Sequence, residues 1–226
     1  MSQSSSTKGL FVVFEGPDGG GKTMQSQRLL AHLQKLDHEV TLTREPGGTA
    51  LAELVRDVVL RGNSYGQISP RVEALLLSAA RSQHIHEVIL PALKAGRVVV
   101  CDRFKYSTLA YQGGGSGLGF SDLRFLNEFS SEGLEADVVI LLDIESKQGL
   151  RRKLGSGDCQ GAEWNKMELR GLEYHQRVRS QFQKMASSAS DRWLVLDGTA
   201  DPDHISEEIF RRVAKEMDSR SITSVN

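Results

Sequence analysis

The chain has 226 residues, of which 39% are hydrophobic and 25% are charged, and its formal net charge is -1. These values predict a soluble globular protein with enough chain for one α/β domain, and the near-neutral charge argues against a nucleic-acid partner. No apolar run approaches the roughly 20 residues of a membrane span, so no membrane partner is expected. The cysteines, Cys101 and Cys159, are too few for a disulfide framework and indicate a cytoplasmic setting.

Five short apolar runs predict buried parallel strands, because uninterrupted apolar and β-branched runs suit strands that are covered on both faces. The runs are Leu10–Phe14, Glu39–Thr43, Arg97–Cys101, Asp137–Leu142 and Trp193–Leu196. Helical patterns lie between them. We therefore predict one doubly wound α/β domain at residues 9–218, with helices on both faces of the sheet. Flexible tails are predicted at residues 1–8 and 219–226.

Three helical patterns follow one another along the chain. The first begins at Lys22, and the third runs from about Lys166 to Met185. The second begins at Pro70, and Pro91 should bend or end its continuation. It carries an i, i+3, i+4, i+7 apolar stripe, formed by Val72, Leu75, Leu76 and Ala79.

Two stretches fit neither a helix nor a strand. Residues Tyr111–Phe120 are rich in glycine, and residues Leu154–Asn165 are polar and small. Both are predicted to be mobile loops, and the second is long enough to be a lid.

The string "GPDGGGKT" follows the first predicted strand and opens the first helix. It matches G-x-x-x-x-G-K-[ST], a phosphate-binding loop that requires this strand-to-helix context. Bare glycines let backbone N–H groups turn toward phosphate oxygens, and the helix N-terminus adds its positive dipole end. Lys22 would reach the β- and γ-phosphates of ATP, and Thr23 would bind Mg²⁺. The predicted cofactor-binding residues are Gly16, Pro17, Asp18, Gly19, Gly20, Gly21, Lys22 and Thr23.

Two further strings narrow the class of enzyme. "TREPGGT" (Thr43–Thr49) follows the second predicted strand, and "CDRFKYSTLAYQGGG" (Cys101–Gly115) follows the third. Together with the phosphate-binding loop, they resemble the thymidylate kinases, especially the bacterial form. The resemblance implies a nucleoside monophosphate kinase fold with a five-stranded parallel sheet and a lid at about 151–168. It also implies a homodimer and the Mg-ATP-dependent conversion of dTMP to dTDP.

The resemblance assigns the phosphate side of the acceptor site. Arg103 matches the family's acceptor-phosphate arginine. Asp102 matches a carboxylate that holds Mg²⁺ through water, with the orientation of Arg103 as its alternative role. Arg56 corresponds to a second dTMP-phosphate arginine, and its alternative is a solvated helix face. Arg44 and Glu45 correspond to residues that line the acceptor site, although Arg44 could instead brace its loop.

The resemblance also assigns contacts to the nucleosides. Asp18 matches the carboxylate that contacts the deoxyribose 3′-OH, Arg81 matches the arginine that binds the thymine edge, and Tyr111 matches the aromatic ring that crowds a 2′-OH. Other nucleoside-side contacts correspond to Ser107, Thr108 and Gln112. On the donor side, the backbone of Thr199 and Ala200 follows the last predicted strand, where the family cradles adenine.

Two positions depart from the family pattern. A phenylalanine usually stacks on thymine four residues before the arginine that corresponds to Arg81, and here Leu77 stands in its place. Leu77 shares a helix face with Arg81, so it offers the pocket apolar area but no ring. In the lid, Lys166 stands where an arginine is expected, and Arg151 and Arg152 are further candidates for the catalytic lid cation. Lysine does not replace arginine at a bidentate phosphate contact.

These departures keep two alternatives open. The chain could be a kinase for another deoxynucleoside monophosphate, because Leu77 replaces the ring that usually stacks on thymine. It could also be a nucleotide-binding regulatory protein that retains the fold without phosphoryl transfer, because its lid is altered. The presence of Lys22, Thr23 and Arg103 counts against the second alternative.

Overall fold

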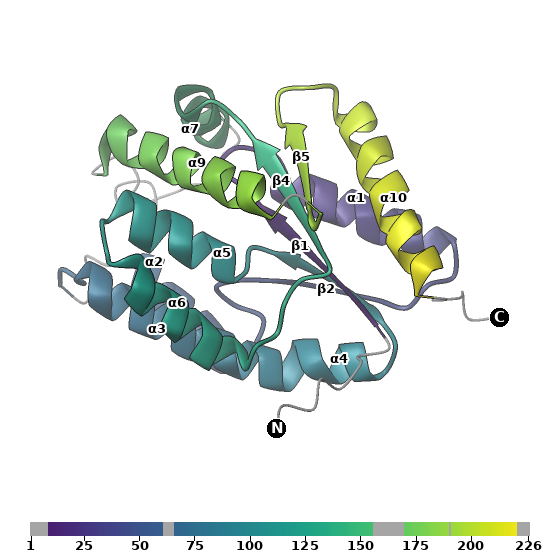
Figure 1. The fold of residues 1–226 in the computed structure, drawn as a ribbon, viewed down its shortest axis with the longest axis horizontal. Coiled ribbons are helices and arrows are strands. Elements are labelled where there is room, and N and C mark those ends of the chain that lie inside the picture. Colours follow the sequence, from purple (N-terminus) through teal and green to yellow (C-terminus); the bar gives the residue numbers. More distant parts are fainter. Residues whose placement is uncertain (1–8, 61–65, 156–169, 190, 221–226) are drawn as a thin grey trace.

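The computed structural model describes residues 9–60, 66–155, 170–189 and 191–220. Five strands form one parallel sheet in the order β2-β3-β1-β4-β5 (Figure 1). They are β1 (Leu10–Glu15), β2 (Val40–Arg44), β3 (Val98–Asp102), β4 (Val138–Asp143) and β5 (Trp193–Asp197). Every predicted strand is confirmed to within one residue at each end. Each strand runs one residue past its apolar run, so a charged side chain ends it at the carboxyl edge of the sheet.

Helices cover both faces of the sheet, as predicted (Figure 1). Leu10, Val12 and Phe14 of β1 pack toward α1 and α10, whereas Phe11 and Val13 pack toward the helices of the opposite face. This alternation produces two apolar cores, one on each side of the strands. The α-helices are α1 (Lys22–Lys35), α2 (Ala50–Leu60), α3 (Pro70–His84), α4 (Leu90–Lys94), α5 (Lys105–Thr108), α6 (Phe120–Ser131), α7 (Ser146–Gly155), α9 (Gly171–Ser188) and α10 (Pro202–Ser219), and the π-helical segments are η2 (Ile85–Ile89) and η3 (Leu109–Gly115).

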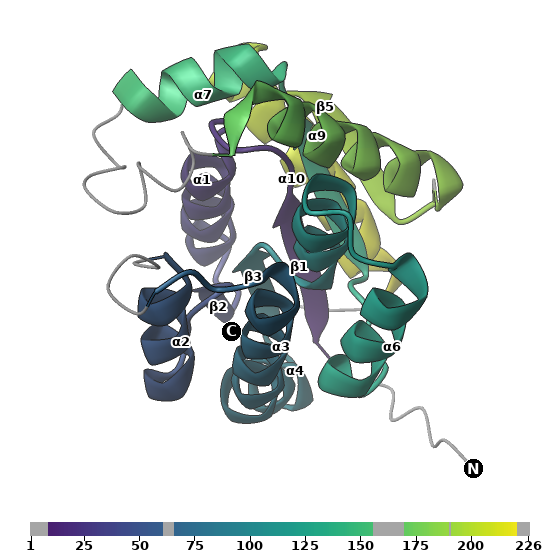
Figure 2. The same cartoon turned by 90° about the vertical axis from the view of Figure 1, so that its left-hand side faces the viewer.

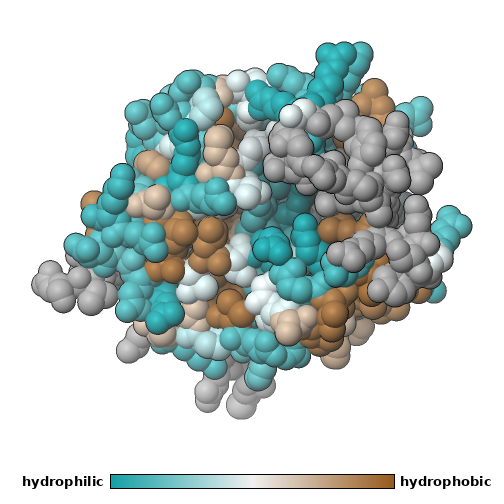
Figure 3. Space-filling view, turned by 180° about the vertical axis from the view of Figure 1, so that it is seen from behind, coloured by the Kyte–Doolittle hydropathy of each residue, from teal (hydrophilic) through white to brown (hydrophobic). Residues whose placement is uncertain are grey.

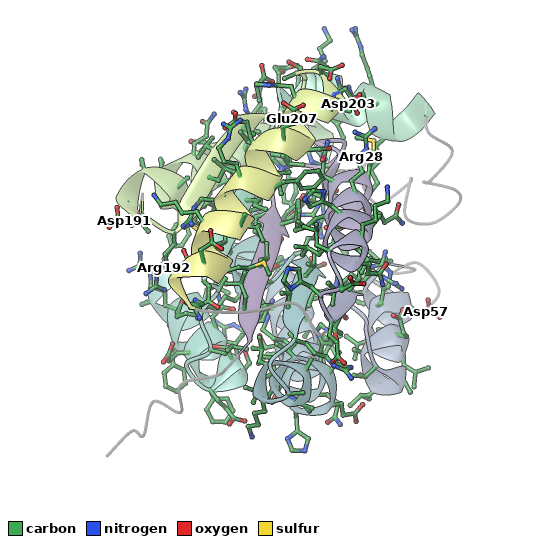
Figure 4. All side chains as sticks on the ribbon, turned by 90° about the vertical axis from the view of Figure 1, so that its right-hand side faces the viewer. Arg28, Asp57, Asp191, Arg192, Asp203 and Glu207 are labelled. Atoms are coloured by element: carbon green, nitrogen blue, oxygen red, sulfur yellow. The ribbon has the colours of Figure 1, made fainter. Side chains whose placement is uncertain are left out.

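Polar contacts join α1 to α10 where both helices begin near the carboxyl edge of the sheet. The labelled side chains of Arg28 and Asp203 lie together (Figure 4), with Arg28 Nη1 2.5 Å from Asp203 Oδ1. Gln25 Nε2 donates to the carbonyl of Pro202 at 2.9 Å. The exposed ion pair contributes little by itself, so the buried apolar residues between these helices supply most of their packing energy.

The prediction of a loop at Tyr111–Phe120 is wrong for its first half, which is helical, whereas residues 116–119 connect two helices. Leu109–Gly115 forms η3, which packs against α9. A Cβ atom on Gly115 would lie 2.4 Å from Tyr174 Cε2, and one on Gly114 would lie 2.8 Å from Gln181 Cβ. These glycines therefore serve close helix packing, which outweighs their low helix propensity.

The helix that begins at Pro70 also continues further than the proline pattern suggests. Its α-helical hydrogen bonding changes to π-helical at Ile85, and Pro91 lies in the first turn of α4, which ends at Lys94. The π-helical turn accommodates the proline without ending the helix.

The apolar stripe of α3 does not face the core. Val72 is 46% exposed and Leu75 is 52% exposed, whereas Glu73, Arg81 and His84 on the opposite face are buried. Helices α2, α3 and α6 lie side by side (Figure 2). The outer faces of α2 and α6 carry further exposed apolar side chains, namely Leu51, Leu54, Phe125 and Phe129. No helix among the described residues is long and apolar enough to cross a membrane.

Candidate active site

A cavity of about 700 Å³ opens at the carboxyl edge of the sheet. One face of the molecule is hollowed and mostly hydrophilic there (Figure 3). The cavity joins the phosphate-binding loop to the segments that follow β2 and β3 and to the polar face of α3, as expected for an open parallel sheet. The predicted site residues that line it are Asp18, Gly19, Gly21, Lys22, Thr23, Arg44, Glu45, Arg56, Leu77, Arg81, Asp102, Arg103, Ser107, Thr108, Tyr111, Gln112 and Arg152.

The phosphate-binding loop has the backbone geometry that its glycines predict. Gly19 has a φ of 78°, and a Cβ atom there would lie 2.0 Å from the carbonyl oxygen of Gly149. Lys22 Nζ donates to the carbonyls of Gly16 at 3.0 Å and Pro17 at 2.7 Å. Burial, followed by repulsion from Arg103, lowers the pKa of Lys22 to about 8. The ammonium group is therefore a poorly solvated donor that is held by backbone carbonyls of its own loop.

Thr23 and Asp102 form an oxygen-rich corner at the end of this loop. Thr23 Oγ1 donates to Asp102 Oδ2 at 2.7 Å. Asp102 Oδ1 is buried and has no hydrogen-bond partner among the described residues. An unpartnered buried carboxylate oxygen is costly, and a hard cation with oxygen ligands would compensate for it. The residues therefore fit Mg²⁺.

Arg103 connects the phosphate-binding loop with the segment after β3. Its Nη2 donates to Asp18 Oδ1 at 2.8 Å, and its Nη1 donates to the Gly16 carbonyl at 3.1 Å and Ser107 Oγ at 3.2 Å. The guanidinium also lies over the ring of Tyr111, 4.9 Å from its centroid. Arg103 has a φ of 73°, which is unusual for a residue with a side chain. Residues held in this region of φ cluster at functional sites.

Asp18 gathers donors from three segments. Besides Arg103, it accepts a hydrogen bond from the Tyr111 hydroxyl at 2.9 Å, and Lys153 Nζ lies 3.5 Å from its Oδ1. Burial by itself would raise the pKa of Asp18, but Arg103, Lys153 and Lys22 outweigh burial and hold it well below the ordinary value. Asp18 therefore holds cations together where the phosphate-binding loop meets the segment after β3 and α7.

Arg81 also lines the cavity and is only 3% exposed. Its Nε donates to Glu45 Oε2 at 2.8 Å, its Nη1 to Asn127 Oδ1 at 2.8 Å, and its Nη2 to Thr108 Oγ1 at 2.9 Å. These contacts use three of the five N–H groups of a guanidinium. No described residue accepts a hydrogen bond from the other two N–H groups. They are therefore available to a ligand in the cavity.

The comparisons with known proteins agree with this geometry. A sequence model of the thymidylate kinase family matches residues 14–209. The chain belongs to the thymidylate kinase family. A thymidylate kinase of Deinococcus radiodurans is 42% identical over 209 residues, which cover 92% of this chain and 98% of that protein. One of Herpetosiphon aurantiacus is 38% identical over 224 residues, with 90% and 94% covered.

A solved structure supports the same family. The crystal structure of thymidylate kinase from Ehrlichia chaffeensis is similar with a TM-score of 0.72 and 29% identity, and the match covers 91% of this chain and 98% of that one. Members of the thymidylate kinase family are kinases, so the chain is a phosphotransferase. The family and the fold class predicted from the sequence are confirmed, and neither alternative finds support in the comparisons.

Two arginines of the "TREPGGT" region and the helix after it serve partly as braces. Arg44 donates to both carboxylate oxygens of Glu53, at 2.9 and 3.0 Å, and Glu53 also accepts from the backbone of Gly48. Arg56 donates to the carbonyl of Pro46 at 3.0 Å. Both arginines still line the cavity, so bracing and ligand contact are compatible in this thymidylate kinase family member.

Sequence reasoning missed the buried carboxylate of Glu15. It accepts hydrogen bonds from the backbone N–H groups of Phe104 and Ser107, at 2.9 and 3.1 Å, and from Ser107 Oγ at 2.7 Å. Burial raises the pKa of Glu15 to about 7, although Arg103 and these hydrogen bonds oppose it. A charged glutamate at the end of an otherwise apolar strand could have marked Glu15 as unusual. Only the tertiary structure shows the partners of its carboxylate.

Lys153, Arg170 and Glu73 are further cavity residues to which the sequence analysis gave no role. Lys153 follows the predicted lid arginines directly, and Arg170 follows the lid. Lys153 of α7 lies 3.5 Å from Asp18, and Arg170, just before α9, pairs with Glu73 of α3. No local pattern reveals these contacts.

Several predicted site residues lie elsewhere. Arg151 is exposed and does not line the cavity, whereas Arg152 lines it and donates to the carbonyl of Gly198 at 2.6 Å. Thr199 lines a separate hollow, and its hydroxyl bonds Asp197 Oδ1 at 2.7 Å. Ala200 packs against the core between α1 and α10. Lys166 and most of the predicted lid lie outside the described residues.

Proposed function

We propose that the protein transfers the γ-phosphoryl group of ATP, bound with Mg²⁺, to the phosphate of dTMP and so forms dTDP for dTTP synthesis in the cytoplasm. One observation carries the proposal. A single cavity is lined both by the phosphate-binding loop and by Arg103, Tyr111 and Arg81, so a triphosphate and a nucleoside monophosphate can meet inside it. Phosphoryl transfer requires positioning and charge neutralisation more than covalent chemistry.

On the donor side, Lys22 and the loop N–H groups would bind the triphosphate, and Thr23 and Asp102 would hold the metal ion. A bound Mg²⁺ neutralises charge that develops on the phosphate oxygens. The α7 cations Arg152 and Lys153 would add positive charge at the junction of the two substrates. Both line the cavity, and Lys153 lies 3.5 Å from Asp18.

On the acceptor side, Arg103 would orient the dTMP phosphate, with Arg56 and Arg44 as flanking charges. Asp18 would accept from the sugar 3′-OH, and the Tyr111 ring, held through its hydroxyl on Asp18, would crowd a 2′-OH. Arg81 would donate to the base, which would lie on Leu77. Because Leu77 gives apolar area without a ring, it favours a base of the right size but no particular stacking geometry.

The test is a coupled ADP-release assay with Mg-ATP and dTMP, dCMP, dGMP or dAMP as the acceptor. We expect the highest kcat/KM with dTMP and no ADP release above background without a monophosphate. Equal or better turnover of another base would contradict the thymidylate assignment. ATP binding without ADP release from any monophosphate would instead support a regulatory protein.

Leu77→Phe should tighten dTMP binding, because a phenylalanine restores a ring face under the base. Ring stacking adds about 0.5–1.5 kcal/mol beyond burial, which corresponds to roughly 2- to 13-fold in Kd. The smaller value is expected if the new ring is crowded. Calorimetric titrations with dTMP and with ATP would measure the effect, and ATP affinity should stay constant. An unchanged or weaker dTMP constant in a folded variant would show that the base does not lie on this side chain.

We also propose that the protein is a homodimer that pairs through the exposed apolar face of α2, α3 and α6. Phe125 and Phe129 are 74% and 77% exposed, and their rings stack on each other. Such a contiguous apolar face is typical of a protein interface. Phe129→Glu should convert a dimer to a monomer in sedimentation experiments. Leu36→Glu, at an exposed position after α1, is the control and should leave the mass unchanged. A monomeric wild type would contradict the proposal.

A further inference from the structure

A buried carboxylate on α3 connects the nucleoside side of the cavity with the segment that precedes α9. Glu73 is 4% exposed. Arg170 Nη2 donates to both of its oxygens, at 2.9 and 2.8 Å, and Gln112 Nε2 donates to Oε1 at 2.8 Å. Glu73, Arg170 and Gln112 all line the cavity.

Arg170 is itself held in place. Its Nη1 donates to the Tyr174 hydroxyl at 2.5 Å, and its guanidinium lies 4.7 Å from the centroid of the Tyr174 ring. The Tyr174 hydroxyl in turn donates to the carbonyl of Tyr111 at 3.1 Å. Arg170 therefore supplies a fixed positive charge beside Glu73. In this ion pair Glu73 is a carboxylate, whose two oxygens accept hydrogen bonds and cannot donate them.

This carboxylate decides which way the Gln112 side chain faces. The two ends of an amide differ only by the exchange of a carbonyl oxygen and an NH₂ group, so their orientation follows from the hydrogen-bond partners. A carboxylate cannot donate, so the NH₂ group of Gln112 must face Glu73 and the carbonyl oxygen must face away from it. No described residue donates to that oxygen, and Gln112 lines the cavity. The cavity therefore receives a hydrogen-bond acceptor at this position and not a donor.

Arg81 presents the opposite pattern, because it retains two N–H groups without a described acceptor. It lies two helical turns from Glu73 on the same face of α3, with Leu77 between them, and its Nη2 bonds Thr108, one turn before Gln112. Gln112 and Arg81 both line the cavity, so it offers an acceptor and a donor to one ligand. This pair matches thymine, which carries an N–H at ring position 3 and a carbonyl oxygen at position 4. Cytosine has the reverse, an unprotonated N3 and an amino group.

We propose that Glu73, held by Arg170, is a positioning residue that fixes the orientation of the Gln112 amide and thereby selects bases with an N–H at ring position 3. The inference rests on the proposed function and adds a mechanism for base selection to it. Substrate contact belongs to Gln112, and Glu73 acts through it. An amide that was free to turn could also bind N3 of cytosine, because its NH₂ group could face that acceptor.

The test compares wild type, Glu73→Gln and Gln112→Leu in steady-state assays with dTMP and dCMP. In Glu73→Gln, residue 73 can both donate and accept, so the Gln112 amide is no longer fixed. We expect the ratio of kcat/KM for dTMP over dCMP to fall about fivefold, which corresponds to one neutral hydrogen bond of about 1 kcal/mol. The change should lie mainly in KM. Gln112→Leu should lower the ratio by a similar factor, and the double variant should lower it no further.

Glu87→Gln is the matched control. Glu87 accepts a hydrogen bond from Gln83 on the exposed side of the helix that continues α3, so it undergoes the same chemical change outside the cavity and should keep the wild-type ratio. Circular dichroism would establish that each variant is folded. If Glu73→Gln does not fold, Gln112→Leu still decides, because an unchanged ratio there would overturn the inference.

The outcomes separate the two proposals. If the wild type does not phosphorylate dTMP, the proposed function fails. If it prefers dTMP strongly and both variants keep that preference, only the role of Glu73 and Gln112 fails. Calorimetric affinities for dTMP and dCMP without ATP should show the same loss of discrimination as the kinetic constants.

Discussion

Lys22→Ala should lower the turnover number by about 10²–10³, the cost of removing one preorganised donor that faces developing charge. Lys22 is 6% exposed and lies inside the loop, with Gly16 and Pro17 carbonyls at 3.0 and 2.7 Å. The phosphates of ATP would replace these carbonyl partners. Because the contact strengthens as charge develops on the transferred group, the loss should appear in kcat more than in the KM for dTMP.

The assay is the initial rate of ADP release at saturating Mg-ATP and dTMP. Lys35→Ala is the matched control, because Lys35 is exposed in the last turn of the same helix, and it should keep the wild-type rate. A folded Lys22→Ala enzyme that retained more than half of the wild-type turnover would show that the phosphate-binding lysine has no part in the transfer.

Between pH 4.5 and 7, the ligand-free protein should lose about 3 kcal/mol of unfolding free energy relative to a Glu15→Gln variant. Burial raises the pKa of Glu15 from 4.5 to about 7, and one pKa unit corresponds to about 1.4 kcal/mol. A carboxyl group with a raised pKa holds its proton more tightly in the folded state. Its contribution is therefore fully present below pH 4.5 and is lost as the pH rises through about 7.

Urea unfolding of both proteins at several pH values and one protein concentration would measure this difference. The variant lacks the titrating group but keeps an oxygen that can accept from the backbone of Phe104 and Ser107. Other groups, including Asp18 with its lowered pKa, titrate in both proteins and cancel in the comparison. Parallel stability curves across this pH range would mean that Glu15 has an ordinary pKa and stays ionised.

Local sequence patterns were sufficient for the strands and for the phosphate-binding loop. The five apolar runs need both faces covered, and only a parallel sheet between helix layers does that. The shape of the phosphate-binding loop could be predicted from "GPDGGGKT" alone, because its backbone N–H groups, the helix N-terminus and Lys22 all belong to one continuous segment. The structure adds the contact of Thr23 with Asp102, which arises because parallel strands bring their carboxyl ends to one edge of the sheet.

The glycine-rich segment after β3 and the stripe on α3 needed the tertiary structure. Propensity argues against a helix at Tyr111–Gly115, but close approach of α9, with Tyr174 against Gly115, makes the helix stable there. The stripe of Val72 and Leu75 follows the helical period correctly, yet the buried face of α3 is the polar one, with Glu73 and Arg81 turned toward the cavity. Periodicity identifies two faces of a helix but not which of them meets the rest of the chain.

The sequence by itself determined the fold class, the family and the identity of the phosphate-binding loop. Each of these depends on short runs of contiguous residues, in which residue type and spacing set the local structure. Only the tertiary structure decided the state of the buried charges. Glu15 is unusual because the backbone of Phe104 and Ser107 encloses it, and Glu73 is placed to act on Gln112 because Arg170 arrives from a segment 97 residues away. Desolvation and Coulomb interactions depend on distance in space and not along the chain, so no local pattern contains them.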